Sequence, residues 1–350
     1  MEVGRAPLDL MSANENTELT SIDEAAVRSR LDQLQNSNLV QIKGGVWGLP
    51  YEYDPFGYIY NADLFRSLGL DPDDPPQTWD ELRAVSATIK RAAPDAWPIC
   101  HPLKNLSKIQ PYIWGAGGTY WNRDTLPTKS TLLNPGTVAG YEFIDEWAKK
   151  EWLNTEEISG SNDLSFMLSR QCAAMNLSSV FVLELQLNDP DTDWRVAPIP
   201  AMDEQHEPIN FAGGSALIVP STSSNPKEAL DLVLWMTGEE AQRLKWGLDP
   251  GLGLSDQDVF TQALPVNRAL SEEIKKVPFW TKAFVEVPSR PAGISPVYSD
   301  SYEVLAAMQE EIVRQDVDVR ETLTAAQEEI QALLDEDIKE NPELYQGVEE

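Results

Sequence analysis

Strand-like and helix-like segments alternate along this chain, and the alternation limits its fold more than any other feature of the sequence. Trp97–Cys100, Trp194–Ile199 and Phe211–Pro220 are short apolar runs typical of strands. Thr78–Ala93 carries apolar residues at the spacing of one helix face, and another helix is expected over 134–150. The alternation predicts an α/β fold with mainly parallel sheets, in which ligands bind beyond the strand ends where the chain crosses over.

The segment Gly44–Glu81 holds the densest set of functional signals in the sequence. It begins with a strand, Val46–Pro50, which we expect Pro50 to end because proline cannot donate a ladder hydrogen bond. A second extended run covers Tyr58–Tyr60. The side chains between the two runs include Tyr51, Glu52, Tyr53 and Asp54. Aromatic rings and carboxylates are therefore expected to meet where strands end.

Helix ends can be read from short local patterns. Asn61 is expected to cap a helix over 62–68, with Gly69 placed to end it. Capping boxes are expected at Thr78 and Glu81, at Ser21 and Glu24, and at Thr237 and Glu240. Short proline-bounded helices are expected beyond Gly247, followed by two long amphipathic helices over 299–314 and 319–334.

The charge balance excludes two classes of partner. The chain has 57 acidic and 27 basic residues, which gives a net charge of −30. Nucleic acid and anionic membrane surfaces would be repelled, so neither is expected as a partner. An acidic, lysine-poor surface is typical of proteins from salt-loving organisms, where salt screens the repulsion. An ordinary acidic extracellular protein is the alternative, and the sequence leaves both open.

Cysteine and histidine are too sparse for a metal site or a disulfide framework. The two cysteines, Cys100 and Cys172, are expected to be buried free thiols. The two histidines, His101 and His206, lie far apart, so we predict no metal and no cofactor. No run approaches the about 20 apolar residues of a membrane span. The first ten residues, MEVGRAPLDL, lack the basic and apolar regions of a signal peptide and predict no lipid anchor.

Four segments follow one another in the order and spacing of a known family. They are WGLPYEYDPFGYIYNADLF at 47–65 with TWDEL at 78–82, WGAGGTYW at 114–121, CAAMNLSSVF at 172–181, and FAGGSALIVPSTSSNPKEALDLVLWM at 211–236. In these segments, and in its closing part over 301–334, the chain resembles the extracellular solute-binding proteins of family 1. These are the maltose-binding-protein-like sugar receptors of ABC importers.

The resemblance implies a two-lobed, type II periplasmic-binding-protein-like fold with mixed or parallel sheets, whose lobes close on a ligand like a hinge. The N-terminal-type lobe would comprise 1–56 and 212–288, and the C-terminal-type lobe 57–211 and 289–350. The crossings between the lobes would fall at 50–56, at 210–213 and near 289–291. Only about 45 residues precede the first matching segment. We therefore expect an incomplete N-terminal lobe with an exposed strand edge in a truncated chain, unless the lobe is completed in another way.

The resemblance also implies polar ligand contacts. Asp54 matches the acidic ligand contact of the family, with Tyr51 and Glu52 beside it. Arg290 is a further candidate for ligand binding. Its guanidinium could pair with an acidic group of a ligand or with a neighbouring carboxylate of the chain.

Aromatic and glycine contacts complete the implied site. The residues that match aromatic contacts of the family are Tyr112, Trp114 and Tyr298. Phe181 stands where many relatives carry a stacking tryptophan, and it offers a smaller platform without an N–H donor. Gly213 and Gly214 match glycines that let the backbone approach a ligand.

A protein of this kind would bind a mono- or oligosaccharide without catalysis and deliver it to the membrane permease of an ABC transporter. Sugars offer apolar C–H faces and hydroxyls, which aromatic platforms and carboxylates suit. A polyamine, glycerophosphodiester or peptide ligand in the same fold stays open as an alternative. The alternative enzyme is a glycoside hydrolase with two carboxylates, although nucleophile elbows and zinc motifs are lacking. By family inference the protein would act outside the cell as a monomer.

Overall fold

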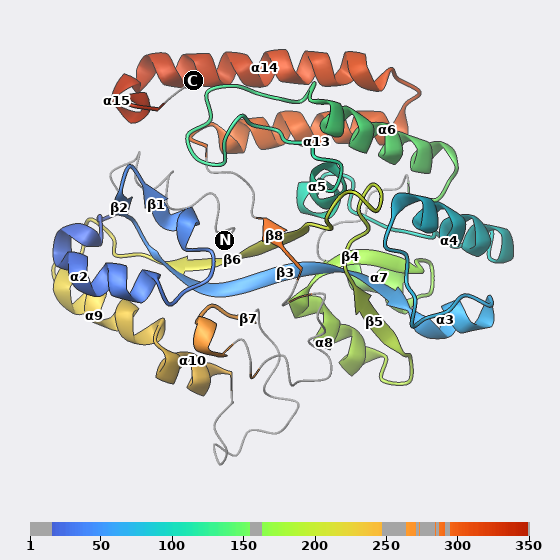
Figure 1. Cartoon of the computed structure of the whole chain (residues 1–350), viewed down its shortest axis with the longest axis horizontal. Coiled ribbons are helices and arrows are strands. Elements are labelled where there is room, and N and C mark those ends of the chain that lie inside the picture. Colours follow the sequence, from blue (N-terminus) through green and yellow to red (C-terminus); the bar gives the residue numbers. More distant parts are fainter. Residues whose placement is uncertain are drawn as a thin grey trace.

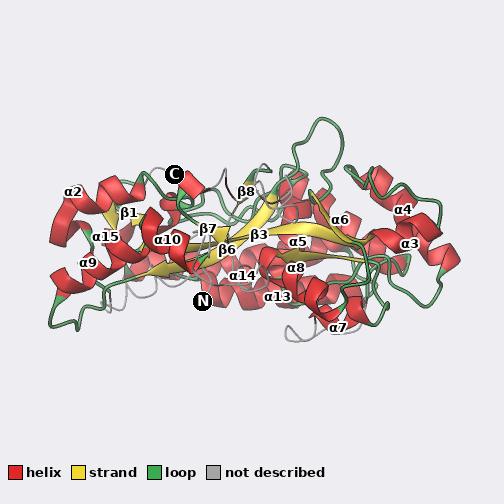
Figure 2. Ribbon diagram, turned by 90° about the horizontal axis from the view of Figure 1, so that it is seen from below, coloured by secondary structure: helices red, strands yellow, loops and turns green. Residues whose placement is uncertain are grey.

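The structure is a computed structural model of the chain. It describes residues 16–154, 163–246, 264–270, 273, 284, 287–290 and 295–348. One long strand, β3, runs through the middle of the molecule, with helices on both sides of it (Figure 1, Figure 2). Most of the short helices expected beyond Gly247 lie outside the described residues.

Strand β3 (Leu49–Asn61) has 13 residues and serves two groups of strands. Its first half pairs with β6 (Asn210–Leu217) and β7 (Leu264–Pro265). Its second half pairs with β4 (Ala174–Ser178) and β5 (Trp194–Ala197). All four pairings are antiparallel, whereas β8 (Ser289–Arg290) runs parallel to β6. The sheet formed by the described residues is therefore mixed, and the expectation of mainly parallel strands is wrong.

Pro50 does not end the strand, contrary to the expectation from the sequence. It lies opposite Ala216 of β6, while Glu52 lies opposite Ser215, so Tyr51 is an extra residue in a β-bulge. A bulge is one of the positions at which a strand accepts proline. The two extended runs read from the sequence are consequently one strand.

The helices fall into two groups around β3. Near its first half lie α2 (Thr20–Leu31), α9 (Pro226–Met236) and α10 (Glu239–Lys245), together with the hairpin of β1 (Gln41–Ile42) and β2 (Gly45–Val46) and the short turns Ser37–Val40 and Arg268–Leu270. Toward its second half lie α3 (Ala62–Ser67), α4 (Trp79–Ala92), α5 (Leu106–Trp114), α6 (Pro135–Lys149), α7 (Asp163–Leu168) and α8 (Ser179–Asn188). The last helices are α13 (Tyr298–Arg314), α14 (Val319–Glu340) and α15 (Pro342–Tyr345), and α13 and α14 pack on each other and on α6 (Figure 1).

Two of the expected cap sites are confirmed by hydrogen bonds. The N–H of Leu64 donates to Asn61 Oδ1 at the start of α3, and Thr78 and Glu81 form a reciprocal capping box at α4. The other two boxes are wrong. Ser21 Oγ donates instead to the carbonyl of Glu18, and Thr237 Oγ1 donates to the carbonyl of Val233 at the end of α9. In both cases the hydroxyl binds a carbonyl that precedes it rather than an N–H that follows it.

The cysteines are not free thiols, because Cys100 and Cys172 form a disulfide. Trp97 makes a parallel bridge with Cys172, and the N–H of Cys100 donates to the carbonyl of Ala174. These contacts bring the two Cα atoms to 5.9 Å, which is within the range of a disulfide. The expected strand Trp97–Cys100 is present only as isolated bridges to its neighbours.

The apolar core continues across the point where β3 changes partners. One cluster contains Leu49 and Leu230 from the first group of elements together with Met175 and Trp194 from the second. A second cluster fills the space among α4, α5, α6, α13 and α14 around Tyr58. The lobe boundaries at 56, 211 and 288 stay a prediction.

Candidate functional site

The candidate site lies where β3 passes from one group of strands to the other. Asp54 is opposite Gly213 of β6, and two residues later Phe56 is opposite Ser178 of β4. Helix α8 begins directly after Ser178. The hydroxyl of Tyr53 forms a hydrogen bond with Ser289 of β8. Four strands and one helix start therefore meet at this point, here called the crossover.

The carboxylate of Asp54 is bound to the first turn of α8. Ser179 Oγ donates to Asp54 Oδ1 at 2.8 Å. Burial of the carboxyl group raises the pKa of Asp54 from 3.8 to about 6, although hydrogen bonds from Ser179 and Ser178 and the charge of Lys108 act against that rise. The residue as a whole keeps part of its surface exposed. Asp54 thus joins the two groups of strands, and burial raises its pKa to about 6.

Glu52 lies two residues earlier and is part of a different cluster. Lys245 Nζ lies 2.6 Å from Glu52 Oε1, and Ser215 Oγ donates to Glu52 Oε2 at 2.7 Å. Burial raises the pKa of Glu52, but the hydrogen bonds from Lys245 and Ser215 outweigh it and leave the pKa below its ordinary value. The same ammonium lies 3.8 Å from the ring centroid of Tyr51. Tyr51 and Glu52 are therefore both in contact with a lysine of α10.

Three aromatic rings from different elements pack on one another at the crossover. The rings of Trp114 and Phe211 are nearly parallel, with centroids 6.1 Å apart, and Phe211 meets Phe56 edge to face at 5.0 Å. The guanidinium of Arg290 lies 5.4 Å from the centroid of Trp114 and also pairs with Asp124. Of the two partners that the sequence left open for Arg290, the neighbouring carboxylate is the one present here.

A buried lysine lies near one of these rings, that of Phe56, and near the ring of Phe181. Lys108 Nζ is 5.0 Å from the centroid of Phe56 and 5.7 Å from that of Phe181, and the residue is only 1% exposed. Its charge favours the ionised form of Asp54. It also acts with burial, which is the larger cause, to hold the pKa of His101 well below its ordinary value. Phe181 therefore belongs to the crossover cluster.

Three of the aromatic candidates, Tyr112, Trp114 and Tyr298, are buried core residues of this structure. Tyr112 is fully buried, with its hydroxyl 3.4 Å from Asn176 Oδ1 and its ring edge-on to Trp147. Tyr298 is 7% exposed and lies at the start of α13 next to Tyr302. Their role in ligand binding stays a prediction.

The two glycines of β6 differ in whether another residue could replace them. Gly214 has φ of +143°, a conformation that other residues rarely adopt. A Cβ atom on Gly213 would meet its nearest neighbours at 3.6 and 3.9 Å, which is ordinary contact. Only Gly214 therefore needs to be glycine for backbone reasons, while Gly213 keeps the strand surface beside Asp54 free of a side chain.

The sequence did not single out Lys108, Lys245, Phe56 and Phe211 as site residues. One local signal could have identified Lys108. Lys108 is the only charged residue in the segment LSKIQPYIW, which forms helix α5 and in which every residue is buried. Lys245 has no comparable signal, because its partner Glu52 is 193 residues away in the sequence.

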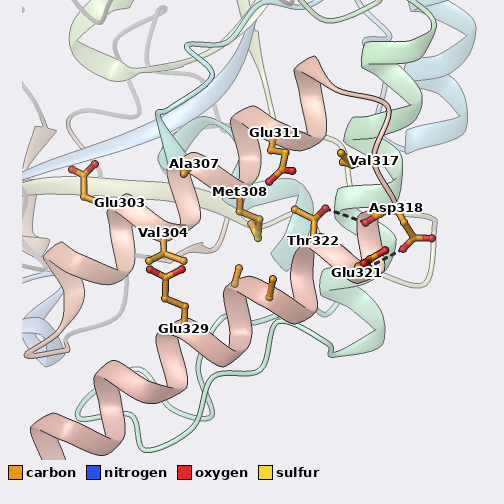
Figure 3. A pocket seen from close by; sticks show the side chains of 12 residues that line it. Glu303, Val304, Ala307, Met308, Glu311, Val317, Asp318, Glu321, Thr322 and Glu329 are labelled. Carbon is orange, nitrogen blue, oxygen red and sulfur yellow. Dashed lines mark hydrogen bonds between the residues drawn. The ribbon is translucent and has the colours of Figure 1, made fainter.

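Two surface grooves lie away from the crossover. One has a volume of about 840 Å³ and lies on the surface between α13 and α14 (Figure 3). Its lining includes the acidic side chains of Glu303, Glu311 and Glu329 and the apolar side chains of Val304 and Met308. The other has about 450 Å³ and lies between α4 and α6. None of the residues predicted to bind ligand lines either groove. We place the candidate site at the crossover because aromatic, acidic and basic side chains converge there.

The described residues contain no group of three or more His, Cys, Asp or Glu side chains that could hold a metal ion. Among the helices of the same residues, none combines the length and the apolar character needed to cross a membrane.

Comparison with known families agrees with this geometry. The model of the family described as bacterial extracellular solute-binding protein matches residues 4–243, which is more than half of the chain. The chain belongs to this family. The match begins well before Trp47, where the resemblance noted in the sequence starts. It is a family of solute-binding proteins and not of enzymes, in agreement with the prediction of a non-catalytic protein.

Curated relatives are distant and longer than the region that matches. The sn-glycerol-3-phosphate-binding periplasmic protein UgpB of Shigella flexneri is 27% identical over 129 residues, which cover 35% of this chain and 26% of the relative. The lactose-binding protein of Rhizobium radiobacter is 24% identical over 202 residues, which cover 56% of this chain and 46% of the relative. The chain thus spans less than half the length of these relatives.

Solved structures show the same fold over nearly the whole chain. A solute-binding protein of an ABC transporter from Thermotoga lettingae, bound to α-D-tagatose, has a TM-score of 0.78 at 20% identity and covers 95% of this chain and 84% of its own. A substrate-binding protein from Listeria monocytogenes in complex with cycloalternan has a TM-score of 0.79 at 15% identity, covering 96% and 84%. UgpB from Mycobacterium tuberculosis with glycerophosphocholine has 0.74 at 18%, covering 94% and 81%. The expected type II periplasmic-binding-protein-like fold is confirmed.

Proposed function

We propose that this protein binds a mono- or oligosaccharide at the crossover and delivers it to the membrane permease of an ABC transporter, without catalysis. The observation that carries the proposal is the convergence of Trp114, Phe211 and Phe56 with the carboxylate of Asp54 at the point where β3 changes partners. That point is also where a hinge between two lobes would bend.

The chemistry of the cluster suits a sugar. The C–H faces of a sugar pack on aromatic rings, and its hydroxyls donate to carboxylates in a cleft with little water. Asp54 Oδ1 accepts a hydrogen bond from Ser179, and the residue as a whole is partly exposed, so its carboxylate can accept from a sugar hydroxyl in place of a hydrogen bond within the chain. Phe181 gives a small platform beside it, which favours a small sugar over a long oligosaccharide.

A glycerophosphodiester is the second candidate, and Arg290 is the observation that favours it. The guanidinium of Arg290 is oriented by Trp114 and pairs with Asp124, a residue whose side chain is 54% exposed. A guanidinium held in this way can exchange a surface carboxylate for a phosphate. UgpB relatives, named for sn-glycerol-3-phosphate or solved with glycerophosphocholine, support this alternative. Polyamines and peptides remain further alternatives.

The expected setting follows from the family. The protein would act at the cell surface as a monomer, with the permease as its partner and no role for nucleic acid. The charge of −30 supports the exclusion of nucleic acid, because phosphate backbones would be repelled. Size-exclusion chromatography with light scattering in high salt tests the monomer directly, and a dimer would refute it.

A thermal-shift panel in high salt tests the function. Neutral mono- and oligosaccharides, glycerophosphocholine, spermidine and short peptides are each added at millimolar concentration. The proposal predicts that at least one sugar raises the melting temperature and that no product appears on incubation with the same glycoside. A shift with glycerophosphocholine alone would favour the second candidate, and turnover of any glycoside would contradict the binding function.

A further inference from the structure

A β-bulge turns two neighbouring side chains of β3 toward the same lysine. Tyr51 is the extra residue between Pro50 and Glu52, so the alternation of side chains is interrupted there. Gln242 Nε2 donates to the carbonyl of Tyr51 at 3.2 Å, and Gln242 Oε1 accepts from the N–H of Val266 at 3.2 Å. Gln242 is fully buried and lies one helical turn before Lys245. Helix α10 is therefore fixed on the bulge through Gln242.

The ammonium of Lys245 is enclosed by the groups that proteins use to recognise free amines. The ring centroid of Tyr51 is 3.8 Å from Nζ, and that of Trp246 is 5.7 Å away. Glu52 Oε1 lies 2.6 Å from Nζ, and Ser215 holds the other carboxylate oxygen. Aromatic faces and a partly buried carboxylate together form a cage for an alkylammonium ion.

The side chain of Lys245 is much less exposed than that of Lys227, an ion-paired surface lysine on α9. The side chain of Lys245 is 15% exposed, and that of Glu52 is 28% exposed. Lys227 of α9, by contrast, is 72% exposed and lies 3.4 Å from Asp231. The contact between Lys245 and Glu52 is thus part of the packed structure and not a solvated ion pair.

We infer that Tyr51, Glu52 and Trp246 form an ammonium-binding site that the chain fills with its own Lys245, so that Lys245 determines specificity by closing this site, which lies beside the crossover, to cationic solutes. The ammonium site itself is independent of any ligand. Its effect on solute choice rests on the solute-binding function proposed above. That effect is to favour neutral solutes over polyamines, because Lys245 already occupies the ring face of Tyr51 and the carboxylate of Glu52.

Chemical rescue tests the site. The substitution Lys245→Ala removes three carbons and the ammonium, which n-propylammonium replaces. Adding n-propylammonium chloride should raise the melting temperature of Lys245→Ala by about 2–4 °C above the value in sodium chloride of equal ionic strength. The wild-type protein should show no such difference, and 1-propanol, which lacks the charge, should not rescue the variant.

Three further variants keep the test specific. Lys245→Met fills the space with an apolar chain and should not respond to the amine. The double variant Lys245→Ala with Glu52→Gln should lose the rescue, because the carboxylate is removed. Lys227→Ala, the matched surface control, should behave as the wild type does. Equal shifts in all variants would mean non-specific binding to the acidic surface and would overturn the inference.

The same variants separate this inference from the proposed function. Lys245→Ala should gain a thermal shift with spermidine that the wild type lacks. Rescue by n-propylammonium in a protein that binds no sugar would leave the ammonium site standing and refute the sugar-binding function. If Lys245→Ala does not fold in sodium chloride, the inference predicts that it folds with the amine. Failure to fold in both, or folding without rescue, would contradict the inference.

Discussion

Glu52 and Asp54 are two residues apart on one strand, yet their surroundings shift their pKa values in opposite directions. Glu52 is held by Lys245 and Ser215, and its pKa falls below the ordinary value. Asp54 is desolvated at the crossover, and its pKa rises to about 6. The comparison teaches that position on a strand does not decide the state of a carboxylate. The state of each carboxylate is decided by the elements packed against it. These are α10 for Glu52, and α5 and α8 for Asp54.

The largest expected effect on stability comes from the disulfide, which lies next to β4, the strand that leads to the Asp54 site. Replacing both Cys100 and Cys172 by serine should lower the free energy of unfolding by about 4 kcal/mol, since the bond closes a loop of 72 residues. The disulfide joins a segment that donates from Cys100 to Ala174 of β4, the strand that leads to α8. Chemical denaturation measures the loss. Unchanged stability would mean that the bond does not form in solution.

Removing the ion pair between Glu52 and Lys245 should lower the free energy of unfolding by a smaller amount. Glu52→Leu leaves the ammonium of Lys245 without its carboxylate in a partly buried place, and we expect a loss of about 2 kcal/mol. Asp231→Leu, which breaks the exposed pair with Lys227, is the matched control and should change stability by less than about 0.5 kcal/mol. Equal losses in the two variants would show that the Glu52 pair is also an ordinary surface pair.

The pH dependence of stability should differ in sign between the two carboxylates. Asp54 binds its proton more tightly in the folded state, so it lowers stability as pH rises from about 4 to about 6, and Asp54→Asn should remove that fall. Glu52 has a depressed folded pKa, so its contribution is present above pH 4.5 and is lost as the pH falls below that value, and Glu52→Gln should flatten this loss. Melting temperatures between pH 3 and pH 8 give both profiles.

Other titrating groups near Asp54 have to be separated from it. Lys108 acts on it from α5, Tyr53 is next to it on β3, and the charge of Lys108 also acts on His101. The pKa of Tyr53 is raised by burial, so Tyr53 does not titrate in this interval. Burial holds the pKa of His101 well below its ordinary value of 6.5, so His101 makes stability rise with pH below that value, opposite in sign to Asp54. The contribution of Asp54 is therefore read from the difference between the wild-type and Asp54→Asn profiles. A profile of Asp54→Asn identical to that of the wild type would contradict the assignment.

The smallest expected effects come from the two serines that bind the carboxylates. Ser179→Ala removes the hydrogen bond to Asp54, and Ser215→Ala removes the one to Glu52. Each should cost about 1 kcal/mol and raise the pKa of its own carboxylate only. Carboxyl chemical shifts followed against pH by NMR would report both. A change at the other carboxylate would show that the two clusters are coupled.

Local signals predicted the parts of the fold that depend on neighbouring residues. Asn61 caps α3, and Thr78 caps α4, because each needs only an N–H a few residues away. Pro50 gave a wrong prediction of where the strand ends, because no local pattern decides its effect. Its effect depends on a bulge that is defined by the partner strand β6. The order and spacing of four motifs identified the family and the fold, which no single local pattern could have done.

Long-range partners account for what the sequence did not predict. The disulfide depends on the bridge between Trp97 and Cys172, which the spacing of the cysteines does not reveal. Lys245 reaches Glu52 only because α10 is fixed on the bulge through Gln242. Asp54 was chosen as the acidic ligand contact, but its bond to Ser179 across the crossover could be seen only in three dimensions.

Solute binding at the crossover is tested most directly by calorimetric titration of three proteins with the solute that gives the largest thermal shift. These are the wild type, Asp54→Asn and Glu52→Gln. We predict that Asp54→Asn weakens binding about tenfold or more, a loss of at least about 1.4 kcal/mol, while Glu52→Gln changes the affinity by less than about threefold. Unchanged affinity in Asp54→Asn, or a larger loss in Glu52→Gln, would contradict a binding site centred on Asp54.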